Sequence, residues 1–91
     1  MNRILKKLTN EMYSIDLDYY YRKIGNYKVK RNKYFIEHFY YDNKICKVYL
    51  YNKKFYLFDC GYNKYRLTTA QLNFLEEYYK SKGYKLEYRG L

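Results

Sequence analysis

The sequence predicts an α+β domain: a five- or six-stranded antiparallel sheet, arranged as a meander, with an N-terminal and a C-terminal helix packed on one face. Two observations lead to this class. Aromatic and β-branched residues dominate 19–58 and are interrupted by polar pairs, whereas the segments on either side have helical spacing. The chain has 91 residues, a length that builds one hydrophobic core, so 1–91 is expected to form a single domain.

The N-terminal segment has the pattern of an amphipathic helix. Its apolar residues recur at helical spacing: Ile4, Leu5, Leu8 and Met12. Charged and amide side chains occupy the other side, and the helix is expected to end near Tyr13–Ser14. No apolar stretch approaches the roughly 20 residues of a membrane helix, and the start lacks the apolar core of a secretory signal.

The middle of the chain is typical of consecutive hairpins. Four polar pairs punctuate it: Gly25-Asn26, Asn32-Lys33, Asp42-Asn43 and Asn52-Lys53. Gly and Asn accept the positive φ angles that two-residue hairpin turns require. Strands are therefore expected at 19–24, 27–31, 34–41, 44–51 and 54–59.

The last third returns to a helix and then a strand. Thr68 and Gln71 have the spacing of a capping box, and Leu67 and Leu72 can form the accompanying hydrophobic staple. Gly83 follows a basic last turn and is expected to end the helix. Beyond it, apolar and charged residues alternate over 84–89, which predicts a final strand.

Two-residue turns fix the register of a hairpin and so predict which side chains share a face. With Asn52-Lys53 as the turn, one face is apolar: Cys46, Val48, Leu50, Phe55 and Leu57. The opposite face carries Lys47, Tyr49, Tyr51, Lys54, Tyr56 and Phe58. With Asp42-Asn43 as the next turn, Phe35 and Phe39 join the apolar face. Four residues then join the Tyr/Lys face: Tyr34, Ile36, His38 and Tyr40. This register puts Glu37 on the apolar face, where Lys28 and Lys30 also fall, and the register of 19–31 stays open.

The composition is basic and rich in tyrosine. The chain has 17 Tyr and a formal net charge of +10, and residues 19–66 hold 12 basic residues against 3 acidic ones. A solvated sheet face usually carries Thr, Lys, Glu and Ser, so a Tyr/Lys face indicates recognition. Lysine suits phosphates, and tyrosine can stack on unpaired bases. An acidic protein surface would suit the same face. Since Lys, Asn and Tyr have A/T-rich codons, a genomic composition bias is a further explanation.

We therefore expect a non-catalytic, cytoplasmic binding protein. Its partner would be nucleic acid or an acidic surface of a nucleic-acid-handling protein. The expected contact residues are Arg31, Lys33, Tyr34, Tyr40, Lys47, Tyr49, Tyr51, Lys53, Lys54 and Tyr56. Small size and an AT-rich codon signature would suit a phage or mobile-element accessory protein, in the host cytoplasm if phage-encoded. Such a protein could inhibit a host nuclease or defence complex stoichiometrically, as anti-CRISPR proteins do. An uncovered Tyr-rich sheet could also pair with a second copy.

The sequence carries little of the chemistry that catalysis needs. His38 is the one histidine and is expected on the solvated face. No acidic pair, Gly-rich phosphate loop, nucleophile elbow or metal cluster is present, so neither a metal nor a cofactor is expected. Cys46 is expected in the core, and Cys60 on the opposite face, too far for a disulfide.

Two short segments resemble small basic ribonuclease toxins of the RelE type. They are Gly25-Asn26-Tyr27-Lys28-Val29-Lys30 and Asp42-Asn43-Lys44-Ile45, which together are similar to the glycine-containing hairpin of that family's sheet. The resemblance implies ribonuclease activity, toxicity on expression, and roles for His38 and Tyr56. The chain departs from the family by its single helix before the sheet and by lacking a His-Arg element after Phe58.

Overall fold

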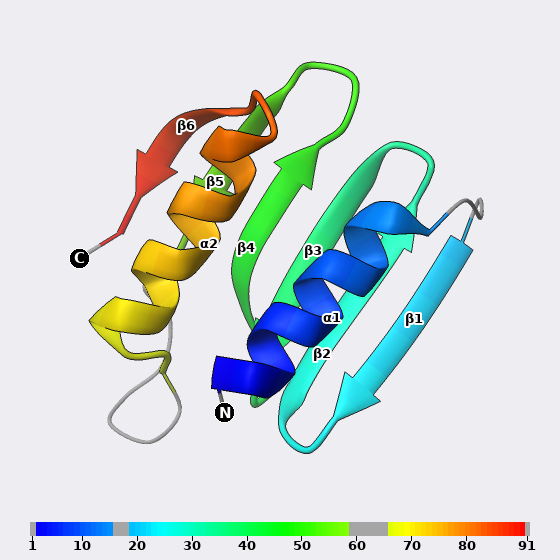
Figure 1. The fold of residues 1–91 in the computed structure, drawn as a ribbon, viewed down its shortest axis with the longest axis vertical. Coiled ribbons are helices and arrows are strands. Elements are labelled where there is room, and N and C mark those ends of the chain that lie inside the picture. The colour runs from blue at the N-terminus through cyan, green and yellow to red at the C-terminus, as the bar shows by residue number, and fades with distance from the viewer. Residues whose placement is uncertain (1, 16–18, 59–65, 91) are drawn as a thin grey trace.

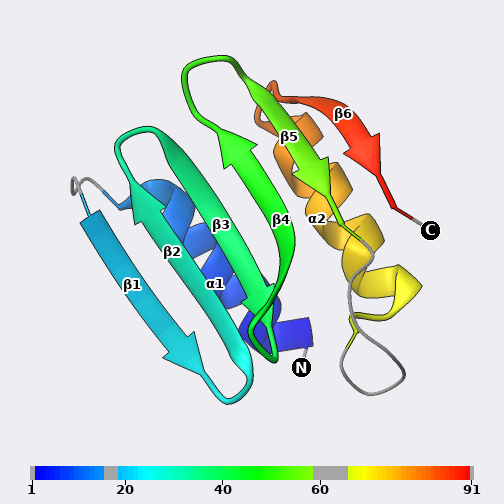
Figure 2. The same cartoon turned by 180° about the vertical axis from the view of Figure 1, so that it is seen from behind.

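Two helices lie on one face of a six-stranded sheet in the computed structural model, which describes residues 2–15, 19–58 and 66–90 (Figure 1). The elements are α1 (Asn2–Ser14), β1 (Tyr19–Ile24), β2 (Tyr27–Asn32), β3 (Phe35–Tyr40), β4 (Asn43–Tyr49), β5 (Lys54–Leu57), α2 (Thr69–Ser81) and β6 (Lys85–Arg89). This confirms the predicted α+β class with a helix from each end of the chain. Seen from behind, no described element covers the sheet (Figure 2).

The strands follow one another in chain order across the sheet, β1-β2-β3-β4-β5-β6. The first four neighbouring pairs are antiparallel, as the meander predicts, but β5 and β6 are parallel. The reason is that α2 lies between them and returns the chain to its starting end before β6 begins. A parallel pair requires such a crossover, whereas a hairpin joins antiparallel strands.

Both helices are amphipathic and bury their apolar stripes against the sheet. The capping box of α2 forms as predicted, because the Thr68 hydroxyl oxygen accepts from Gln71 N at 3.2 Å and Gln71 Oε1 accepts from Thr68 N at 2.9 Å. The buried core between the layers comprises Leu5, Leu8, Met12, Tyr27, Val29, Ile36, Ile45, Cys46, Val48, Phe55, Leu57, Leu67, Leu72, Leu75, Tyr79 and Tyr84.

The four hairpins differ in how well the sequence predicts them. Gly25-Asn26 is a two-residue turn as expected, since Ile24 pairs with Tyr27 and Gly25 has φ 60°. The turn expected at Asn52-Lys53 is wider, because Tyr49 pairs with Lys54. That register lies two residues from the predicted one, and since side chains alternate with a period of two, the predicted faces of β4 and β5 are preserved.

The predicted register of β3 is wrong by one residue. Tyr40 pairs with Asn43, so the turn residues are Tyr41 and Asp42, which have φ angles of 50° and 64°. A bulge then shifts the pairing between His38 and Phe39. A one-residue slip moves every side chain of a strand to the other face. Ile36, His38 and Tyr40 therefore face the helices, while Phe35, Glu37 and Phe39 face away from them.

The hairpin between β2 and β3 differs from its predicted register by two residues, which keeps the relative faces of these two strands. Arg31 pairs with Ile36, so the connection is wider than the predicted Asn32-Lys33 turn. The Asn32 side chain organises it by accepting from Tyr34 N at 2.8 Å and Phe35 N at 2.9 Å. Because β2 keeps its face relative to β3, the one-residue slip of β3 also brings Lys28 and Lys30 to the uncovered face, and the sequence-based difficulty of two lysines in the core disappears.

Candidate functional site

The sheet surface opposite α1 and α2, which we term the open face, is the candidate site (Figure 2). Strand alternation and the observed registers place these side chains on it: Tyr19, Tyr21, Lys23, Lys28, Lys30, Phe35, Glu37, Phe39, Lys44, Lys47, Tyr49, Lys54, Tyr56, Phe58, Lys85, Glu87 and Tyr88. Most of its apolar surface is aromatic ring, and its charges are lysines with two glutamates.

An unbroken row of five rings crosses the open face from β3 to β6; we call Phe35, Tyr49, Tyr56, Phe58 and Tyr88 the aromatic row. Ring centroids are 6.5 Å apart for Phe35 and Tyr49, and 5.7 Å apart for Tyr49 and Tyr56. The row continues from Tyr56 to Phe58 at 6.4 Å with nearly parallel rings, and from Phe58 to Tyr88 at 6.2 Å. Such pairs stabilise each other by about 0.5–1.5 kcal/mol, so the row is a pre-ordered surface.

Lysine ammonium groups lie against these rings. Lys47 Nζ is 4.3 Å from the Phe35 ring centroid and 5.1 Å from that of Tyr49. A second group flanks Phe39, whose ring centroid is 4.7 Å from Lys28 Nζ and 5.4 Å from Lys30 Nζ. These distances are those of cation–π contacts, which hold the ammonium groups near the surface while leaving them hydrated.

The positive charge of the open face is only partly compensated. Glu37 Oε2 lies 2.7 Å from Lys44 Nζ and 4.0 Å from Lys47 Nζ, so two lysines share one carboxylate. Lys54 Nζ lies 3.5 Å from Glu87.

Three further lysines of this face, Lys23, Lys30 and Lys85, have no carboxylate of the described residues within ion-pair distance. The face therefore favours anions.

The structure divides the predicted contact residues into three groups. Four lie on the open face as expected: Lys47, Tyr49, Lys54 and Tyr56. Four lie in the two turns at one end of the sheet: Lys33, Tyr34, Tyr51 and Lys53. Of these, Tyr34 is 53% and Tyr51 is 73% exposed, and their ring centroids are 6.0 Å apart.

The other two predicted contact residues, Arg31 and Tyr40, lie on the opposite side of the sheet. Arg31 Nη1 donates to Met12 O at 2.8 Å and Tyr13 O at 2.7 Å, so it caps the C-terminal end of α1. Tyr40 packs against the core beside its strand partner, Tyr27. Both corrections follow from the same one-residue error in the register of β3.

Sequence reasoning missed several residues of the open face. Phe35 and Phe39 were expected in the core, and Lys28, Lys30 and Tyr88 were assigned to no site. The sequence did contain a sign of the error, since two lysines and Glu37 fell on a face that was otherwise apolar. Burying charged side chains without partners is costly in free energy. Three such conflicts in adjacent strands indicate a register error rather than three buried ion pairs.

His38 is fully buried, contrary to the expectation that it faces solvent. Its Nδ1 is 2.7 Å from the Tyr27 hydroxyl oxygen, and its Nε2 is 2.6 Å from that of Tyr79. The Thr9 hydroxyl donates to Leu5 O at 2.7 Å and also lies in hydrogen-bond contact with Tyr27. A neutral imidazole has one donor and one acceptor nitrogen, so one of the two tyrosine hydroxyls donates to His38 and the other accepts from it.

This network is a core element and not a solvent-facing catalytic group. Burial lowers the pKa of His38 from 6.5 to about 3, so the imidazole is neutral at physiological pH. Burial likewise raises the pKa values of Tyr27 and Tyr79 well above 10. The role that the RelE resemblance implies for His38 requires contact with a substrate, and in this structure protein atoms surround the ring on every side. Cys46 is also buried, as predicted.

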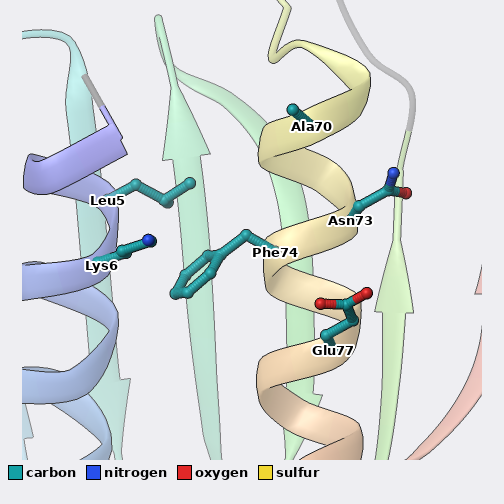
Figure 3. A pocket seen from close by; sticks show the side chains of 6 residues that line it. All are labelled: Leu5, Lys6, Ala70, Asn73, Phe74 and Glu77. Atoms are coloured by element: carbon teal, nitrogen blue, oxygen red, sulfur yellow. The ribbon is translucent and has the colours of Figure 1, made fainter.

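The helical side of the molecule has two hollows. One, of about 370 Å³, lies between α1 and α2, where Lys6 Nζ lies 5.8 Å from the Phe74 ring centroid (Figure 3). Its walls also carry Leu5, Asn73 and Glu77, so it combines apolar surface with one charge of each sign. The other hollow lies at the end of the sheet that holds Tyr34 and Tyr51.

The described residues contain no group of three or more His, Cys, Asp or Glu side chains that could hold a metal ion. Within the same part of the chain, neither helix has the length and apolar character needed to cross a membrane. Comparisons with protein-family models, with curated proteins and with solved structures find no match.

Proposed function

We propose that the protein binds single-stranded nucleic acid on its open face. The observation that carries this proposal is the aromatic row with Lys47 beside it, on a sheet surface that no described element covers. Proteins that bind single strands combine aromatic platforms for the bases with basic side chains for the backbone. A four-stranded sheet with exposed rings binds RNA in this way in other proteins. Double-stranded nucleic acid would offer the row no free base face, so the preference is for unpaired strands.

The energetics of this arrangement are favourable. Base stacking on a protein ring contributes about 1–3 kcal/mol per base. Since the ring pairs already pack against one another, little conformational entropy is lost when a base stacks on them. The lysines add a salt-dependent contribution through counterion release. The cytoplasm, where RNA and transiently unpaired DNA are both present, is the setting we propose for this activity.

The test is fluorescence anisotropy with a labelled 12-nucleotide single strand and the matching duplex. The single strand is expected to bind more tightly. The double substitution Tyr49→Ala and Tyr56→Ala should weaken single-strand binding by roughly 30-fold or more, about 2 kcal/mol. The matched control is Tyr49→Phe with Tyr56→Phe, which keeps both rings and should retain most of the affinity.

A second pair of variants tests the charge contribution. Lys47→Gln should weaken binding and reduce the salt dependence, by a slope of about 0.7 for each phosphate that the protein no longer neutralises. Lys7→Gln removes the same charge from the exposed surface of α1, on the other side of the sheet, and should leave binding unchanged. Equal effects of the two substitutions would mean that only net charge matters, and the open face would not be the site.

A protein partner is the alternative outcome. The open face would also suit an acidic protein surface, as a stoichiometric inhibitor of a nuclease or defence complex would need. In that case the purified protein should show no single-strand affinity at moderate salt, and nuclease treatment should leave its complex with one large partner intact. That pair of results would overturn the nucleic-acid proposal.

A further inference from the structure

A second basic surface, a groove, lies at one end of the sheet. It has a volume of about 320 Å³, and its lining includes Tyr13, Arg31, Lys33, Tyr51, Lys53 and Tyr84. Figure 1 shows why these residues meet: the β2–β3 and β4–β5 turns and the C-terminal ends of α1 and α2 all lie at this end of the molecule. Four of the ten residues predicted to contact a partner line this groove.

Among the described residues, the groove carries three cations and no compensating carboxylate. None of its lining residues is acidic. Within the described ranges, Arg31, Lys33 and Lys53 have no carboxylate oxygen at ion-pair distance. The Tyr84 hydroxyl adds no negative charge, since burial raises its pKa to about 12. The open face, by contrast, pairs several lysines with Glu37 and Glu87.

The cations of the groove are held in place. The two α1 carbonyls that accept from Arg31 offset about half a unit of its charge through the helix dipole, and they fix the guanidinium in position. Its Nε is buried and has no hydrogen-bond partner among the described residues. Lys53 Nζ lies 4.6 Å from the Tyr84 ring centroid and Lys33 Nζ lies 5.2 Å from that of Tyr34. A pre-ordered cluster of this kind binds a compact anion at low entropic cost.

The groove also lies beside the start of the aromatic row. Phe35 directly follows Tyr34, and Tyr49 is the last residue of β4 before the turn that holds Tyr51 and Lys53. A strand stacked on Phe35 and Tyr49 would therefore reach the exposed pair Tyr34 and Tyr51 when it passes the end of the sheet, and Tyr51 also lines the groove.

We infer that the groove binds the terminal phosphate of the single strand whose bases stack on the open face. The chemical reason is charge. A terminal phosphomonoester carries about −1.5 to −2 charges at neutral pH, whereas an internal phosphodiester carries one. Three cations without a carboxylate partner among the described residues favour the more highly charged group. The inference rests on the proposed function, because the strand on the open face delivers the phosphate to the groove.

The experiment compares three 12-nucleotide oligothymidylates in anisotropy competition: one with a 5′-phosphate, one with a 3′-phosphate and one with hydroxyls at both ends. A phosphate at one end is expected to strengthen binding at least fivefold in low salt. The double substitution Lys33→Gln and Lys53→Gln should abolish that preference. Lys6→Gln with Lys7→Gln, which has the same net charge and lies on α1, should keep it.

A separate readout distinguishes failure of the groove from failure of the open face. Inorganic phosphate is titrated into ¹⁵N-labelled protein, and amide resonances of Lys33, Tyr51 and Lys53 are expected to shift in the wild type but not in the double lysine variant. Equal affinity for all three oligonucleotides would overturn the inference while leaving the proposed function intact. Phosphate-induced shifts without any strand affinity would overturn both the proposed function and the inference that the groove binds the phosphorylated end of a strand.

Discussion

Lowering the pH from 7 to 5 should destabilise the protein through His38. The imidazole is fully buried between Tyr27 and Tyr79, and burial lowers its pKa from 6.5 to about 3. In the unfolded chain the same ring regains a pKa near 6.5. The unfolded state therefore binds a proton in this pH interval that the folded state does not bind. Stability is full above pH 6.5 and falls as the pH drops toward the folded pKa.

The magnitude follows from this difference in proton binding. Between pH 7 and 5 the free energy of unfolding should fall by about 2 kcal/mol, and between pH 7 and 6 by about 0.7 kcal/mol. Both figures require only that the folded pKa lies well below 5. Since His38 is the one histidine of the chain, no other side chain of ordinary pKa titrates near 6.5. For a domain of this size, about 2 kcal/mol is a substantial share of the total stability.

The assay is urea unfolding followed by circular dichroism at pH 7, 6 and 5 in constant salt. The matched control is His38→Gln, which keeps one donor and one acceptor but cannot be protonated, so its stability should be nearly flat over this interval. A two-dimensional ¹H–¹⁵N spectrum of the imidazole should show a single neutral tautomer and no titration down to pH 5. If the wild type and the variant have the same pH dependence, His38 is not a buried neutral ring and its hydrogen bonds to Tyr27 and Tyr79 are wrongly assigned.

Two further predictions concern the α2 cap and the buried thiol. Thr68→Ala removes one half of the capping box and should lower the free energy of unfolding by about 1 kcal/mol in urea titrations. Thr68→Ser keeps the hydroxyl and should retain the stability of the wild type. Unchanged stability with alanine would show that the cap does not support the helix. Cys46 should not react with a thiol reagent in the native state when the other cysteine is replaced, Cys60→Ser, because the thiol is buried and burial raises its pKa. Rapid labelling without denaturant, measured by absorbance of the released chromophore, would mean that the core opens near Cys46.

The helices and the core pattern of two strands were predictable because their signals are local. Thr68 and Gln71 define a helix start through side chains three residues apart, and the structure contains that capping box. The alternation of Val48 with Tyr49 in one strand, and of Phe55 with Tyr56 in the next, separates the two faces without reference to any other part of the chain. A register error of two residues left this separation unchanged. The predicted contacts on β4 and β5 therefore lie on the open face.

The faces of β2 and β3 were not predictable in this way, because they depend on the lengths of two turns and on one bulge. Moving the two-residue turn from Asp42-Asn43 to Tyr41-Asp42 shifts the pairing by two residues and by itself keeps every side chain on its face. The bulge between His38 and Phe39 changes this shift to an odd number, which brings His38 to the core and Phe35 to the open face. The choice is made by packing. The observed register buries Ile36 and satisfies both nitrogens of His38, and it brings Glu37 to the lysines of the open face. None of these packing, hydrogen-bond and ion-pair interactions can be recognised from a short stretch of sequence.

By itself the sequence determined the α+β class, the positions of both helices and the concentration of positive charge in the sheet. The tertiary structure decided which tyrosines belong to the core and which to the open face. Tyr27 and Tyr79 are fully buried, whereas Tyr49 and Tyr56 stand on the side without helices. The physical reason is that a tyrosine has an apolar ring and a polar hydroxyl, so it suits either environment. Whether a tyrosine is buried depends on whether the fold places a hydrogen-bond partner, such as His38, beside its hydroxyl.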